Sequence, residues 1–226
     1  MFPPRKILAF TLIEILAVIA IIAILAGILI PTTVGARTAA NRARTRIQFA
    51  QWAAAIEAFR QEYGCYPEFD VSGKVNGGAA ARPDALHPFH DLLAGRRRDG
   101  SGLPAASAAW PAPEAQNFRR MPFLVFAEGE LFPAGEADPA LRGLLHDGFG
   151  NTDIAVLVDR NLDGVIDTLD YPELPRVAPS GAGGGALFPG NGDFPAGPGG
   201  GVRAGAIFYA APPRAADASQ LILSWK

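Results

Sequence analysis

The chain has 226 residues, among them 26 Gly and 20 Pro, with 20 Lys and Arg against 22 Asp and Glu. This length allows one compact domain plus a separate helix, and the Gly and Pro content predicts much turn and loop. The formal net charge of −2 gives no bulk attraction to nucleic acid, so no nucleic-acid partner is expected. The single cysteine, Cys65, excludes an internal disulfide.

The first 30 residues combine a short basic segment with a long apolar run. Arg5 and Lys6 come first, and the sixteen residues 15–30 carry no polar side chain. A secretory signal peptide has a shorter apolar region, about 7 to 15 residues, which ends at a cleavage site. As a helix, the 21 residues 10–30 are about 31 Å long, enough to cross a hydrocarbon core of about 30 Å. We therefore predict a transmembrane helix over residues 10–30.

Glu14 lies at the start of this helix, directly before the apolar run. A carboxylate costs about 2.5 to 3.5 kcal/mol at mid-bilayer and less near an interface, so its presence predicts a partner. The alternative is a carboxylate that snorkels to the interface of an ordinary membrane anchor.

These residues resemble the type IV prepilin family, which includes the pseudopilins of type II secretion and the pilins of type IV pili. In that family a prepilin peptidase cuts off a short basic leader before a Phe and methylates the new amino group, and the fifth mature residue is Glu. The resemblance implies that residues 1–9 are a leader, cleaved between Ala9 and Phe10. It also implies methylation of Phe10 and a role in assembly for Glu14. Ala9 replaces the usual Gly and is small enough for the same pocket.

The resemblance also implies partners and a location. The expected partners are the prepilin peptidase and methylase, an inner-membrane assembly platform, other pseudopilin or pilin subunits, and membrane lipid. The N-terminus would be cytoplasmic and the head periplasmic, with a single pass through a bacterial inner membrane before assembly into a filament. An unpaired Phe10 ammonium and an unpaired Glu14 carboxylate are both costly in hydrocarbon, so we expect them to pair between neighbouring subunits.

The helical pattern resumes after Pro31. One apolar stripe with spacings of three and four, followed by Gly64 as a stop signal, consists of Phe49, Trp52, Ile56, Phe59 and Tyr63. We predict one helix over residues 10–63, kinked near Pro31, whose second half packs on a head formed by residues 64–226. The basic residues between the two halves face lipid phosphates, acidic groups of adjacent subunits or solvent; they are Arg37, Arg42, Arg44 and Arg46.

The head is predicted to combine loops with a small antiparallel sheet. Residues 66–120 read as loops with short helices, and residues 179–201 as a long exposed loop rich in Gly and Pro. His87 and His90 are weak evidence for a metal site and favour a surface loop or short helix. Short apolar runs predict strands at residues 122–127, 154–158, 206–210 and 221–225. The predicted fold class is pilin-like α+β, a long N-terminal helix packed on this sheet.

Residues 159–170 have the spacing of a twelve-residue calcium loop. The oxygen ligands at positions 1, 3, 5, 7, 9 and 12 would be Asp159, Asn161, Asp163, the carbonyl of Val165, Asp167 and Asp170. Gly164 at position 6 permits the tight turn. Position 12 is Asp where a hand-type loop usually has Glu, and the preceding run is β-like, so we expect weak Ca²⁺ binding without paired flanking helices. The alternative is a turn rich in Asp and Asn that binds nothing.

The turn at residues 147–151, Asp-Gly-Phe-Gly-Asn, is similar to the Asp-Pro-Trp-Gly-Asn turn of the major pseudopilin of type II secretion, whose head also carries calcium. Together with the calcium loop, it favours a structural subunit of a type II secretion pseudopilus. A type IV pilus pilin, for adhesion, motility or DNA uptake, is the alternative, followed by a membrane-tethered calcium-binding module. A nucleophile elbow, a P-loop and a zinc helix motif are all missing from the sequence, so we do not expect an enzyme.

Overall fold

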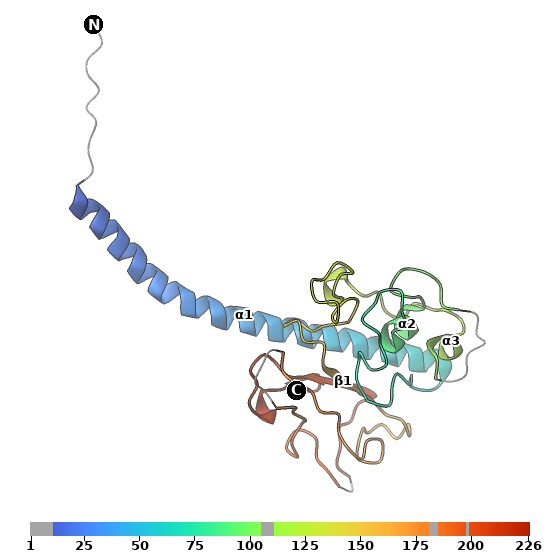
Figure 1. Cartoon of the computed structure of the whole chain (residues 1–226). Helices are drawn as coiled ribbons and strands as arrows, with labels where there is room; N and C mark the ends of the chain where they lie inside the picture. Colours follow the sequence, from blue (N-terminus) through green and yellow to red (C-terminus); the bar gives the residue numbers. More distant parts are fainter. Residues whose placement is uncertain (1–10, 105–110, 181–184, 198) are drawn as a thin grey trace. The chain divides into compact units, whose positions relative to one another are not determined.

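The computed structural model describes residues 11–104, 111–180, 185–197 and 199–226, without the side chains of residues 28–32. Its helices are α1 (Leu12–Tyr63), α2 (Pro88–Ala94) and α3 (Pro113–Gln116), with 3₁₀ turns at Glu128–Glu130 and Ala218–Gln220 (Figure 1). The strands β1 (Ile154–Val158), β2 (Ala206–Ala210) and β3 (Ile222–Leu223) form one antiparallel sheet in the order β1-β2-β3. The predicted α+β class is confirmed. The chain divides into two compact units between Asn41 and Arg42.

In the first unit, α1 exposes large apolar side chains all around the helix, from Leu12 to Leu25. The helix continues without a break through residue 31, and the kink near Pro31 stays a prediction. No helix in the described part of the chain is both long enough and apolar enough to span a bilayer. The span over residues 10–30 stays a prediction.

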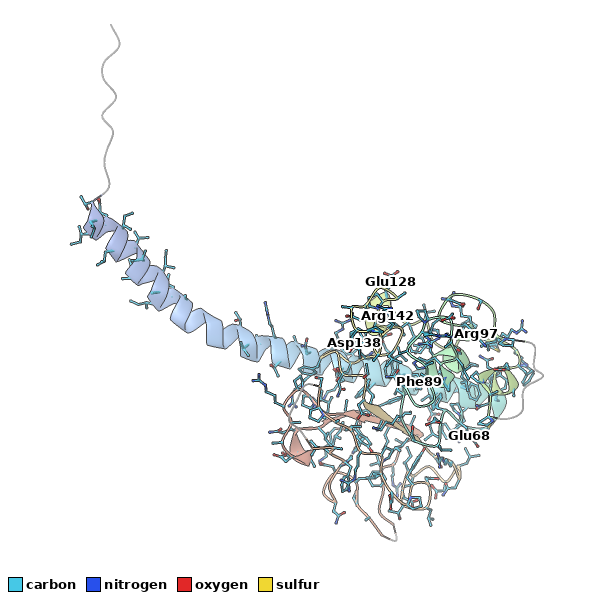
Figure 2. All side chains as sticks on the ribbon, viewed as in Figure 1. Glu68, Phe89, Arg97, Glu128, Asp138 and Arg142 are labelled. Atoms are coloured by element: carbon cyan, nitrogen blue, oxygen red, sulfur yellow. The ribbon has the colours of Figure 1, made fainter. Side chains whose placement is uncertain are left out.

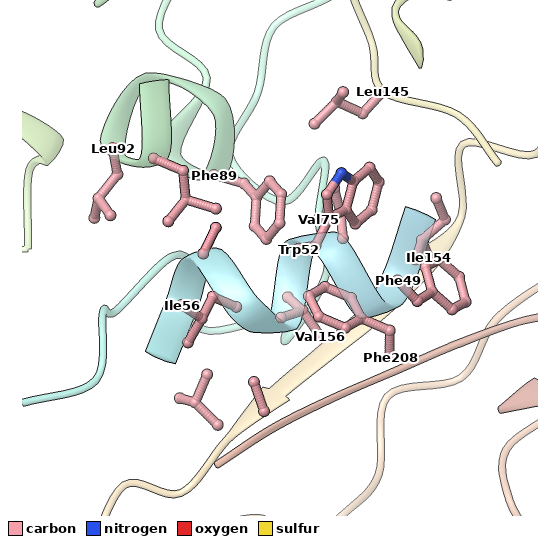
Figure 3. Packing of buried hydrophobic residues seen from close by; sticks show 14 of the residues in the cluster. Phe49, Trp52, Ile56, Val75, Phe89, Leu92, Leu145, Ile154, Val156 and Phe208 are labelled. Carbon is pink, nitrogen blue, oxygen red and sulfur yellow. The ribbon is translucent and has the colours of Figure 1, made fainter. Parts of the chain in front are cut away.

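In the second unit, the apolar stripe of α1 forms the centre of the core. Phe49, Trp52, Ile56 and Phe59 are completely buried. The Phe49 ring stacks on Phe208 of β2 at a centroid distance of 5.5 Å, and Trp52 meets Phe208 edge-on at 5.6 Å (Figure 3). The spacing of the stripe thus directs one face of the helix onto the sheet, as predicted.

Both faces of the sheet are covered, which explains why its strands read as continuous apolar runs rather than alternating ones. All residues of β1 and β2 are buried. One face packs under α1 through Ile154, Val156, Val158, Ala206, Phe208 and Ala210. The other face carries Ala155, Leu157, Ile207 and Tyr209 and packs against loop residues that include Tyr171, Val177 and Phe194.

Two strand predictions need correction. Residues 122–127 form no strand. The amides of Phe123 and Leu124 donate to the Leu93 carbonyl near the end of α2, so this apolar run covers the core as an irregular segment. The strand predicted at residues 221–225 is limited to Ile222–Leu223. The Gly-rich segment is irregular as predicted within its described part, although the buried Phe194 anchors it to the core.

Candidate assembly and calcium sites

Glu14 forms a capping box at the N-terminus of α1. Its Oε2 accepts hydrogen bonds from the amide and from the hydroxyl of Thr11, both at 2.8 Å. The amide of Glu14 donates in turn to the Thr11 hydroxyl oxygen at 3.3 Å. This reciprocal pattern satisfies backbone donors that have no partner inside the first helical turn. Ala9 and Phe10, the residues of the predicted cleavage site, lie outside the described residues.

The helix that follows Glu14 has no apolar stripe, because its apolar side chains point in every direction. Leu12 and Ile13 are 84% and 73% exposed, and the large apolar residues up to Leu25 are all at least half exposed. A helix that is apolar all around is stable only when other apolar groups surround it. This part of α1 therefore requires lipid or neighbouring helices.

In the second unit, the loop 159–170 begins directly at the end of β1. Asp159 is almost fully buried, and its carboxylate accepts hydrogen bonds from the amides of Gly164 at 2.8 Å and Asp163 at 3.2 Å. Asp170 is also buried and accepts hydrogen bonds from the amides of Arg160 at 3.1 Å and Asn161 at 3.2 Å. The two ends of the loop are thus drawn together by its own amides.

The remaining candidate ligands lie toward the surface. Asn161 Oδ1 accepts a hydrogen bond from the Asp163 amide at 2.9 Å, and Asp163 Oδ1 accepts one from the Val165 amide at 2.8 Å. Asp167 Oδ1 accepts a hydrogen bond from the Leu169 amide at 2.7 Å. Each of these side chains closes a local turn, which is a common use of Asp and Asn in loops.

The Gly-rich segment packs against this loop. Val202 and Ile166 exchange backbone hydrogen bonds at 2.9 Å. Gly201 has a φ of +95°, and a Cβ there would lie 2.5 Å from the Ile166 carbonyl oxygen. Only glycine fits this approach. A hollow of about 280 Å³ remains between the two segments, lined by Asp163, Val165, Asp167, residues 199–201 and Arg203.

The donor set of the loop suits Ca²⁺ in kind. Carboxylate, amide and carbonyl oxygens are the hard ligands that this ion prefers. Burial raises the pKa of Asp170, and the nearby Asp159 carboxylate raises it further, so the loop concentrates negative charge that a cation would neutralise. In the described residues, no three His, Cys, Asp or Glu side chains converge closely enough to hold a metal. The calcium site therefore stays a prediction.

The turn at residues 147–151 is structural. Asp147 Oδ1 accepts hydrogen bonds from the amides of Phe149 at 2.8 Å and Asn151 at 2.9 Å. The Asn151 side chain donates to the carbonyls of Ala178 and Ala211, and the Gly148 amide donates to the Thr45 hydroxyl oxygen of α1 at 3.0 Å. The turn therefore connects α1, the sheet and a loop.

A buried polar network at α2 was not anticipated from the sequence. The short helix predicted here is present as α2, but the predicted surface position is wrong, because His87 and Asp91 are fully buried. His87 caps α2 by accepting a hydrogen bond from the His90 amide at 3.3 Å, and its Nε2 lies 3.0 Å from Asn76 Oδ1. Burial drives the pKa of His87 well below its usual value, and the positive charge of Arg98 lowers it further. The sequence signal was a polar residue before Pro88, a common way to begin a helix.

The comparison with known protein families identifies the N-terminal segment. Residues 4–30 match the prokaryotic N-terminal methylation motif. The chain therefore carries a type IV prepilin-like segment, which confirms the resemblance inferred from Arg5, Lys6, Phe10 and Glu14. The motif is that of pilin-like subunits, which are processed by a prepilin peptidase, anchored in a membrane and assembled with other subunits. No curated protein and no solved structure matches the chain.

Proposed function

We propose that the chain is a structural subunit of a type II secretion pseudopilus, a filament that supports protein export across the outer membrane. The observation that carries this proposal is the methylation motif at residues 4–30, placed at the start of a long helix whose far end packs on a small α+β head. The turn at residues 147–151 and the loop 159–170 favour the pseudopilus over a type IV pilus. Such a subunit is structural and catalyses no reaction.

The proposed assembly step uses Glu14. After cleavage between Ala9 and Phe10, the methylated ammonium of one subunit pairs with the Glu14 carboxylate of its neighbour. The capping box supports this role, because both bonds from Thr11 go to Oε2 and no described residue donates to Oε1. A donor from a second subunit can therefore bind Oε1 while the helix remains capped.

Before assembly, the apolar half of α1 anchors the subunit in the inner membrane, with the leader in the cytoplasm and the head in the periplasm. The exposed apolar side chains from Leu12 to Leu25 support this placement, because lipid would cover them until neighbouring helices replace it. The prepilin peptidase and the assembly platform are the partners at this stage.

The test is the intact mass of the protein, extracted from membranes of a host that has a prepilin peptidase. We expect a mass that starts at Phe10 and includes one methyl group. A mass that retains residues 1–9 would refute processing at Ala9. Glu14→Ala should leave insertion and cleavage unchanged and greatly reduce filament yield, and normal filaments from this variant would exclude the pairing mechanism.

We also propose that the loop 159–170 binds Ca²⁺ through Asp159, Asn161, Asp163, the Val165 carbonyl, Asp167 and Asp170. The bound ion would neutralise the buried carboxylates and hold the loop against the Gly-rich segment. The buried pair Asp159 and Asp170 supports this proposal, because burial and the nearby Asp159 carboxylate raise the pKa of Asp170. The quantity to measure is the rise in the melting temperature of the protein when Ca²⁺ is added.

A further inference from the structure

One face of α1 in the second unit is exposed and makes no hydrogen bond or ion pair that the described residues show. We call it the neck face and define it by Arg46, Ile47 and Ala50. All three residues are exposed, and Ile47 is 61% exposed. None of the ion pairs among the described residues uses Arg46. A basic residue beside an exposed apolar one is unusual on this part of α1, where Phe49, Trp52, Ile56 and Phe59 are all completely buried.

The neighbouring arginines differ from Arg46 because they bind the head of their own chain. Arg42 donates to the Gln220 carbonyl at 3.4 Å, and Arg44 donates to the Gly129 carbonyl at 3.2 Å. Each residue of a helix turns the side-chain direction by about 100°, so Arg46 points about 200° away from Arg44. Arg46 thus faces away from the segment that Arg44 contacts.

That segment is a projection with the opposite charge, which we call the acidic lobe, residues 128–140. It contains Glu128, Glu130, Glu136 and Asp138 and no Lys or Arg. Figure 2 labels Glu128 and Asp138 on it, and both are exposed. The ion pairs of the described residues include none of the lobe carboxylates. Val125, just before the lobe, is 76% exposed, so the lobe also has an apolar neighbour.

The lobe is held in place at its base. The Phe132 amide donates to the Leu144 carbonyl at 3.0 Å, and the Gly143 amide donates to the Phe132 carbonyl at 2.9 Å. The side chain of Gln48 on α1 donates to the His146 carbonyl at 2.9 Å. The lobe is therefore a fixed surface, which loses little conformational freedom when a partner binds.

We propose that the neck face of one subunit docks on the acidic lobe of a second copy of this chain. Charge complementarity selects the occupant, because Arg46 would meet the lobe carboxylates while Ile47 packs against Val125. The two surfaces differ and lie on different parts of the same chain. Contacts of this kind are heterologous and build an open filament when the rotation does not close. The inference rests on the proposed function, since it names the contact by which the heads of a filament follow one another.

Cysteine cross-linking tests the contact in assembled filaments. In a Cys65→Ser background, Ile47→Cys and Val125→Cys together should give covalent dimers and higher multimers upon oxidation, while each single variant gives none above background. The matched control pairs Ile47→Cys with Leu169→Cys, an apolar residue that is 79% exposed and lies outside both surfaces. Multimers from the control pair as abundant as from the test pair, or none from the test pair, would overturn the proposal.

Charge reversal gives an independent readout. Arg46→Glu places like charges across the contact and should reduce filament yield by about tenfold or more. Asp138→Arg should do the same, and the double variant should recover most of the yield because the pair is restored with opposite polarity. An unchanged yield in Arg46→Glu would overturn the proposal. Filaments of the test pair that form normally but give no cross-link refute only this contact, whereas a wild-type chain that keeps residues 1–9 and forms no filaments refutes the proposed function itself.

Discussion

Replacing Asp163 by Asn separates charge from structure in the loop 159–170. Asp163 is exposed, and its Oδ1 accepts a hydrogen bond from the Val165 amide at 2.8 Å, which the Asn carbonyl oxygen can also accept. The bond that Asp163 Oδ2 accepts from the side-chain Nδ2 of the exposed Asn161 at 2.9 Å is replaced by water. We therefore expect an unchanged melting temperature without calcium and a weaker response to it.

The size of the response follows from mass action. An ion present at one hundred times its Kd stabilises the folded chain by about 2.7 kcal/mol. In a unit as large as residues 42–226, each kcal/mol shifts the Tm by about 2 to 4 °C, so calcium should raise the Tm by about 5 to 11 °C. A tenfold weaker Kd removes about 1.4 kcal/mol, and Asp163→Asn should therefore show about half of this shift at the same concentration.

The assay is thermal unfolding of the full chain in detergent, with EDTA as the baseline and CaCl₂ or MgCl₂ added in series. Asp217→Asn is the matched control, because Asp217 is also exposed and also caps a local turn, through the Ser219 amide at 2.9 Å. It should respond to calcium like the parent chain. The absence of a calcium shift in the parent chain would refute the site, and an undiminished shift in Asp163→Asn would refute this ligand set.

Three further predictions concern the fold and the helix start. Gly205→Ala should lower the free energy of unfolding by about 1 to 3 kcal/mol, which denaturant titration measures. The reason is that a Cβ at this position would lie 1.8 Å from Glu57 Oε1 and 1.9 Å from the Tyr66 hydroxyl oxygen. Burial holds His87 neutral in the folded chain, so its contribution to the free energy of unfolding is complete above pH 6.5. As the pH falls below 6.5, this contribution is lost by up to about 1.4 kcal/mol per pH unit, which denaturant unfolding at pH 7 and pH 5 measures. Thr11→Ala should speed amide hydrogen exchange in the first turn of α1.

Each of these predictions has a control. Gly192→Ala should be neutral, because a Cβ there meets nothing within 4 Å, and an equal loss in both glycine variants would contradict the argument from close approach. His87→Asn keeps an acceptor at the start of α2 and should show a flatter pH dependence, so an unchanged profile would assign the effect to another group. Equal exchange in Thr11→Ala and the parent chain would show that the capping box does not hold the helix start.

The elements with a strong period could be predicted from the sequence. Phe49, Trp52 and Ile56 define one face of α1 by spacing alone, and the two longest strands were found because each is a short, fully apolar run. Residues 122–127 have the same appearance, yet their amides bind the end of α2. Which backbone groups an apolar run finds as partners is decided by the tertiary fold, so composition alone cannot distinguish a strand from an irregular cover of the core.

In the candidate sites, too, local features could be predicted from the sequence, whereas features that depend on the tertiary fold could not. The spacing of residues 159–170 predicted a tight loop with a glycine turn at Gly164, whose φ is +86°. It did not predict that Asp159 and Asp170 would be buried, because burial depends on the tertiary fold, in which the Asp159 amide donates to the Gly205 carbonyl far along the chain. The network around His87 was missed for the same reason, since its partner Asn76 belongs to a different loop.

The proposed assembly gives Glu14 an intermolecular role beside its local one, and the capping box makes the two roles compatible. The spacing of Thr11 and Glu14 is that of a capping box, so Glu14 stabilises its own helix even when no partner is present. A cap needs an acceptor but not a charge, whereas pairing with the ammonium at Phe10 needs the charge. Because the cap uses only Oε2, the same bonds that fix the helix start also hold Oε1 in one position for a neighbour. In the proposed assembly, the intramolecular cap would therefore position the carboxylate in advance and lower the entropy that pairing costs.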